Sequence, residues 1–112
     1  MGELAVRQLK TVYECNGVQI THTQLDPGQE IPWHKHTEVA DTFYAIQGPI
    51  TIEIAGSDQE IVLSPGESAQ VGRGLAHRVS NRGHEMVEFL LIQGIGKYDF
   101  RATDDAGGDK TR

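Results

Sequence analysis

The sequence predicts an all-β protein built from many short strands. Apolar residues recur at every second position in several segments, which is the period of a strand with one buried face. The clearest case is Ile50, Ile52 and Ile54, which alternate with Thr51 and Glu53. Nowhere do apolar residues recur at helical spacing over about ten or more positions. With short segments of this kind throughout, a sandwich or barrel of strands is expected.

Turn sequences divide the chain into these short segments. Asp26-Pro27-Gly28 and Ser64-Pro65-Gly66 each combine a proline, which fixes φ, with a glycine, which accepts positive φ. Asn81-Arg82-Gly83 is a further turn signal, and Gly56-Ser57 suits a hairpin loop. The expected strands cover residues 18–23, 42–47, 50–54, 60–63, a short stretch at Val71, 76–80 and 86–93.

The length of 112 residues fits one domain. We expect this domain to span residues 3–101, without an internal linker. Residues 102–112 are polar and rich in glycine, and none of them is aromatic. Such a composition cannot bury enough apolar surface to order itself, so a disordered tail is predicted there.

The charge balance excludes some classes of partner. Lys and Arg total 10 against 16 Asp and Glu, a formal net charge of −6. We therefore expect neither nucleic-acid binding, which needs a basic surface, nor attraction to an anionic membrane. Cys15 is the single cysteine, so one chain forms no internal disulfide. The N-terminal residues hold no apolar run of signal-peptide or membrane-span length, and a cytoplasmic protein is expected.

Histidines and one aspartate form the candidate site. His34 and His36 stand two positions apart, so both imidazoles share one face of a strand. Asp41 follows His36 by five positions, an odd number, so on one straight strand it would lie on the opposite face. To share the site, the chain has to bend between His36 and Asp41, and Asp41 has to begin a neighbouring strand. A carboxylate leading an apolar inward row needs a partner, and a metal cation would supply one. His77 lies far along the chain, and spacing alone does not bring it to the others.

Two stretches together resemble the cupin family. Gly28-QEIPW-His34-Lys35-His36-TEVA-Asp41-TFYAIQ-Gly48 is similar to the first cupin motif, and Gly66-ESAQV-Gly72-Arg73-Gly74-LA-His77-RVS-Asn81 to the second. Asp41 stands where the pattern has Glu, and Gly72 where it has Pro. The resemblance implies a double-stranded β-helix, a jelly-roll barrel. It also implies one divalent transition metal, held by His34, His36, Asp41 and His77.

Imidazole and carboxylate ligands suit Fe, Mn, Ni, Zn or Cu and do not single out one of them. His22 and Gln47 are candidates for a supporting catalytic role. His22 falls on the face of Val18 and Ile20, and Gln47 on the inward row of Phe43. An ordinary hydrogen-bonded strand histidine is the alternative for His22.

The expected function is that of a mononuclear metal-dependent enzyme acting on a small organic molecule, with dioxygenase-like chemistry favoured. The alternatives are a non-catalytic metal or small-ligand binding module, or a cupin isomerase or lyase. The expected partners are a small-molecule substrate or ligand and a second copy of the chain. Residues 6–13 could add to a neighbour's sheet edge, so we expect a homodimer.

Overall fold

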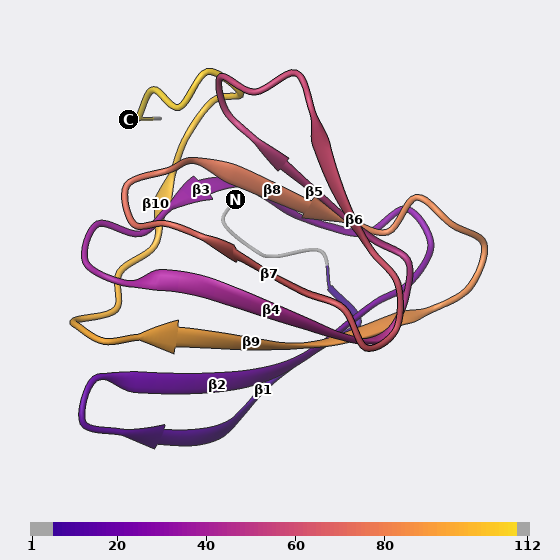
Figure 1. Ribbon diagram of the computed structural model, residues 1–112, viewed down its shortest axis with the longest axis horizontal. Coiled ribbons are helices and arrows are strands. Elements are labelled where there is room, and N and C mark those ends of the chain that lie inside the picture. Colours follow the sequence, from indigo (N-terminus) through magenta and orange to yellow (C-terminus); the bar gives the residue numbers. More distant parts are fainter. Residues whose placement is uncertain (1–5, 110–112) are drawn as a thin grey trace.

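The computed structural model describes residues 6–109, and these fold into ten strands (Figure 1). Within that range no helix is long and apolar enough to span a membrane. The strands are β1 (Gln8–Cys15), β2 (Val18–Leu25), β3 (Glu30–Lys35), β4 (Ala40–Gln47), β5 (Ile50–Ile54), β6 (Glu60–Leu63), β7 (Ser68–Val71), β8 (His77–Ser80), β9 (Val87–Gly94) and β10 (Arg101–Ala102).

The strands form two antiparallel sheets that face each other. One sheet has the order β1-β2-β9-β4-β7 and the other β10-β3-β8-β5-β6. In Figure 1 the first sheet lies below the second, and the chain crosses between them several times. This arrangement confirms the predicted all-β class and its double-stranded β-helix.

The core fills the space between the two sheets. Phe43 of β4 and Phe89 of β9 are fully buried from one side, and Ile52 of β5 and Val79 of β8 from the other. Along β9 every second residue is buried, which is the predicted period of two. The inner face of each strand is therefore defined by its core residues, and polar residues on the same face also point inward.

The strand register carries polar residues to one part of this inner face. Asp41 of β4 pairs with Gln93 of β9, and Gln93 pairs in turn with Gln19 of β2. In the opposite sheet, His34 of β3 pairs with His77 of β8. The pairing of β3 with β8 thus joins two histidines that are 43 positions apart in the printed sequence.

The structure differs from the expected tail over residues 102–109. β10 pairs with Lys35 and His34 of β3, and the next residue, Thr103, is 1% exposed. The Asp104 carboxylate then accepts the N–H groups of Ala106 and Gly108, at 3.0 and 2.8 Å. The strand pairing of β10 and the hydrogen bonds to the Asp104 side chain hold this segment in place, although it has almost no apolar surface. Amino-acid composition alone does not reveal such contacts. Residues 110–112 lie outside the described part of the chain.

Candidate metal centre

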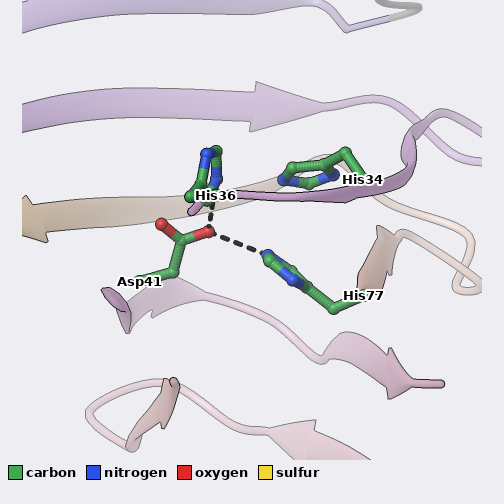
Figure 2. Close-up of side chains that lie close together, drawn as sticks. All are labelled: His34, His36, Asp41 and His77. Carbon is green, nitrogen blue, oxygen red and sulfur yellow. Dashed lines mark hydrogen bonds and ion pairs between the residues drawn. The ribbon is translucent and has the colours of Figure 1, made fainter. Parts of the chain in front are cut away.

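Three histidines and one aspartate converge between the two sheets (Figure 2). His34 lies on β3, His36 directly after that strand, Asp41 on β4 and His77 at the start of β8. Each is 1–3% exposed. One potential ligand atom from each residue lies within 4.8 Å of all the others. We call these four residues the His–Asp centre.

Backbone carbonyl groups fix the orientation of all three imidazoles. Nδ1 of His34 donates to the Pro32 carbonyl at 2.8 Å, and Nδ1 of His77 to the Leu75 carbonyl at 2.9 Å. Nδ1 of His36 donates to the carbonyl of Asp99. A carbonyl oxygen only accepts, so each hydrogen sits on Nδ1. Each Nε2 therefore keeps its lone pair for the centre, as metal-binding histidines require.

The Asp41 carboxylate lies directly against these lone pairs. Its Oδ2 is 2.8 Å from Nε2 of His77 and 3.0 Å from Nε2 of His36. With the hydrogens on Nδ1, these contacts bring acceptor against acceptor in a buried site. Such an arrangement is stable only when a proton or a metal cation lies between the atoms. The donor set therefore fits a divalent cation.

The pKa values of these groups follow from burial and from their neighbours. Burial, with the nearby His77 ring, lowers the pKa of His34 to about 3. Burial would lower the pKa of His36 too, but the Asp41 carboxylate and the Asp99 carbonyl outweigh it and raise that pKa. Burial would raise the pKa of Asp41, yet the hydrogen bonds of His36 and His77 hold it well below its usual range. Near neutral pH, His34 is thus neutral and Asp41 ionised.

A cavity of about 50 Å³ opens beside the centre. Leu9, Tyr98 and Phe100 line it and are each more than a third exposed, so they form its rim. The Phe100 ring stacks on His34, with ring centroids 4.4 Å apart and an angle of 10° between the planes. The Tyr98 ring lies 5.3 Å from that of His36.

Asp99 ties the irregular segment between β9 and β10 to the centre. Besides its carbonyl contact with His36, its carboxylate accepts the backbone N–H and the hydroxyl of Thr37, both at 2.8 Å. Sequence reasoning missed Asp99, Phe100 and Gln93. Only Gln93 carried a signal, because it continues the inward alternation of Phe89 and Leu91.

His22 and Gln47 both lie away from the His–Asp centre, and for His22 the alternative of an ordinary hydrogen-bonded strand histidine holds. The buried face of β2 carries Thr21 and Thr23. His22 therefore points outward, and its Nε2 is 2.6 Å from Glu88. Gln47 is exposed and donates to the Met86 carbonyl, because a register irregularity after Ala45 takes it off the inward row.

The side chain that supports the His–Asp centre, the role expected for His22 or Gln47, is Gln93. Its amide Nε2 donates to Asp41 Oδ1 at 2.9 Å and lies 3.3 Å from Nε2 of His36.

Replacing Gln93 with methionine removes this hydrogen-bond donor and keeps a side chain of similar size. We expect metal affinity to fall about 10–100-fold, the usual cost of losing a group that orients a ligand. Gln47→Met makes the same change outside the site and should leave affinity unchanged in equilibrium dialysis. Equal losses in the two variants would contradict this role for Gln93.

The Asp41 side chain, one methylene shorter than the glutamate of the cupin motif, contacts both His36 and His77. In Asp41→Glu the added methylene has to enter a fully buried site. We expect the free energy of unfolding to fall by about 1–3 kcal/mol through overpacking, with a loss of metal affinity. Urea unfolding and metal titration measure the two effects. A clear gain in metal affinity would mean that the natural carboxylate is too short.

The fold and the site define a double-stranded β-helix protein with a buried three-histidine, one-aspartate cluster compatible with metal binding. The family described as "Cupin domain" matches residues 21–93, well over half of the chain. The chain therefore belongs to the cupin family, as its two motifs indicated. The matched range contains the whole His–Asp centre.

Individual relatives agree with this assignment. The chain is 33% identical over 63 residues to the tetracenomycin polyketide synthase protein TcmJ of Streptomyces glaucescens, covering 56% of this chain and 41% of TcmJ. It spans less than half the length of the curated relatives it matches. A Klebsiella pneumoniae protein with a double-stranded β-helix domain superposes with a TM-score of 0.76 at 27% identity, over 92% of this chain and 86% of that one. Oxalate oxidase in complex with glycolate shares the fold, with a TM-score of 0.69 at 22% identity over 77% and 46% of the two chains.

Proposed function

We propose that this protein is a mononuclear metal-dependent enzyme that acts on a small organic molecule. One observation carries the proposal. Three buried Nε2 atoms and a carboxylate surround one point, and every Nδ1 is already held by a backbone carbonyl. A core histidine with only a structural role does not need this arrangement, whereas a metal ligand does.

The residues of the site would have different roles. The His–Asp centre would hold the metal, and Gln93 would hold the Asp41 carboxylate in place. When bound, a divalent transition metal supplies Lewis acidity toward a substrate oxygen and, where it is redox-active, electron transfer. Burial and the neighbouring Asp41 charge raise the pKa of Tyr98, so its hydroxyl at the rim stays protonated and able to donate a hydrogen bond.

Among reaction types we favour dioxygenase-like oxidation. Three imidazoles and one carboxylate would hold the metal and would leave it able to bind further oxygen ligands, which suits oxygen-dependent chemistry on an organic substrate. The relation to TcmJ, a polyketide synthase protein by name, supports an organic substrate. Isomerase or lyase chemistry would use the same ligand set.

The small cavity favours a second candidate, a non-catalytic metal or small-ligand binding module. A cavity of about 50 Å³ holds a few waters, whereas small-molecule pockets usually have a volume of roughly 300–1,000 Å³. A binding module can work with a closed site of this size. An enzyme has to move the Tyr98 and Phe100 side chains to admit a substrate.

Oxygen uptake distinguishes the two functions. Protein loaded in turn with Fe(II), Mn(II), Ni(II), Zn(II) and Cu(II) would be offered catechols, diketones and keto acids in an oxygen-electrode cell. The enzyme proposal expects uptake with one metal and one substrate class, abolished by a chelator and restored by adding that metal back. Tight ligand binding without turnover under any of the five metals would support the binding module.

We also propose that the protein forms a homodimer through β1. This strand is at the edge of its sheet, and Leu9, Val12 and Tyr13 on it are all about half exposed. Unpaired edges of this kind commonly pair with a second chain. Light scattering after size exclusion should give twice the chain mass, and Val12→Lys should shift it toward the monomer. A monomeric wild-type protein would contradict the proposal.

A further inference from the structure

The walls of the cavity beside the His–Asp centre are mainly apolar. Hydrocarbon side chains come from both sheets and from the rim. The polar lining groups are the His34 and His36 imidazoles, the Asp41 carboxylate, two amides and two hydroxyls. Among the described lining residues, Asp41 is the one carboxylate, and none is a lysine or an arginine. The apolar lining residues are Leu9, Ile31, Phe43, Val79, Leu91 and Phe100.

The charge of the centre sets the charge it can accept. Three neutral imidazoles and one carboxylate contribute −1, so a divalent ion brings the filled centre to +1. A ligand with one negative charge neutralises it. A dianion leaves one excess negative charge next to a carboxylate that is 1% exposed. In a site of low dielectric constant such an unbalanced charge is expensive.

The position of the rim adds a second requirement. The centre lies at the inner end of the cavity, while Leu9 and Phe100 line it and also reach the surface. A ligand whose oxygens reach the metal therefore lies with the rest of its body against hydrocarbon side chains. Apolar groups gain by leaving water there, whereas a second charged group would lose its hydration.

We propose that the centre selects a singly charged oxygen chelator with an apolar body, of the enolate or phenolate type, over a dicarboxylate or a phosphate ester. The inference rests on the proposed metal site and names the substrate class of that same site. It attributes the specificity to the residues of this chain that line the cavity, so measurements of ligand binding, without turnover, are enough to test it.

Calorimetry with nickel(II)-loaded protein tests the selection. The probes are tropolone, which presents two oxygens and one negative charge on an apolar ring, and oxalate, which presents two oxygens and two charges. Each affinity is divided by the same ligand's affinity for free nickel(II), and protein-bound nickel is measured again afterwards. We expect the corrected preference for tropolone to be at least about tenfold, because oxalate leaves a buried charge unbalanced.

The result separates this inference from the proposed function. Protein that takes up no nickel overturns both. Protein that takes up nickel and prefers oxalate, or does not discriminate, overturns the inference and leaves the metal site standing. Tropolone preferred on bound nickel supports both.

Gln19 offers a charge test on the cavity wall. It lines the cavity from β2, opposite Gln93 in the register, and its amide contacts Thr11 rather than the centre. Gln19→Lys adds one positive charge at similar length and should raise the corrected oxalate affinity at least about tenfold relative to tropolone, since it balances the second charge. The neutral control Gln19→Met should keep the tropolone preference. An unchanged oxalate affinity in folded, nickel-loaded Gln19→Lys would overturn the charge argument.

Discussion

Replacing His77 with alanine should lower the affinity for a divalent transition metal at least about hundredfold while the barrel stays folded. Loss of a group that merely orients a ligand already costs about 10–100-fold, and His77 would be a ligand itself. The variant removes the Nε2 that lies 2.8 Å from Asp41 and leaves Asp41 with fewer partners in a buried site. Equilibrium dialysis with nickel(II) measures the change, and circular dichroism checks the fold.

Two further variants make this result specific. His84→Ala is the matched control, because His84 is an exposed histidine away from the centre, and its metal affinity should equal that of the wild type. His77→Gln retains side-chain volume and a polar group, which covers the case in which the alanine variant does not fold. A folded His77 variant with wild-type metal affinity would remove His77 from the ligand set.

Acid should release the metal, with His36 setting the pH at which release begins. A histidine ligand has to be neutral, so protons compete with the metal. The pKa of His36 is raised above 6.5, since Asp41 and Asp99 outweigh the effect of burial, whereas burial holds the pKa of His34 at about 3. As the pH falls, His36 therefore takes up a proton while His34 stays neutral. Below the pKa of His36, each pH unit should lower the apparent affinity at least about tenfold, because the metal displaces at least the proton on His36.

The expected pH curve has a definite sign and range. Affinity is full above the pKa of His36 and falls at least about a hundredfold between pH 6 and pH 4. The Asp41 carboxylate stays ionised over this range because its pKa is well below its usual value. Nickel(II) dialysis from pH 8 to pH 4, with circular dichroism at each point, gives the curve. Metal that stays bound with constant affinity at pH 4 would argue against histidine ligation.

Most of the fold and the centre itself could be read from the sequence. The period of two in Ile50–Ile54 and in residues 86–93 gave the all-β class, and the structure confirms strands there. The opposite parity of Asp41 required a bend after His36, and the structure has β3 ending at Lys35 and β4 beginning at Ala40. The placement of His77 came from the resemblance to cupin motifs, because no local pattern specifies that β3 pairs with β8.

The misplaced side chains have physical causes of their own. In β2 the period of two was correct, but the more apolar face, with Val18, Ile20 and His22, is only half-buried, and the threonine face is the buried one. Strand alternation identifies two faces, and only the packing of the second sheet decides which one is inside. For Gln47, the alternation was correct up to Ala45. The register irregularity after Ala45 then turns the Gln47 side chain to the outer face.

The contribution of residues 95–100 could not be predicted. This segment has no regular secondary structure, and its contacts with His34 and His36 depend on how it returns across the barrel from β9. An irregular segment leaves no periodic signal in the sequence. Asp99 and Phe100 were therefore visible only once the chain was folded.

Elemental analysis of protein purified without chelators tests whether the four converging side chains form a metal site. We expect close to one equivalent of a single transition metal per chain, falling to background when His34, His36 and His77 are all replaced by glutamine in protein that still folds. Metal-free wild-type protein that takes up no divalent transition metal on titration at pH 8, or equal metal content in the triple variant, would contradict it.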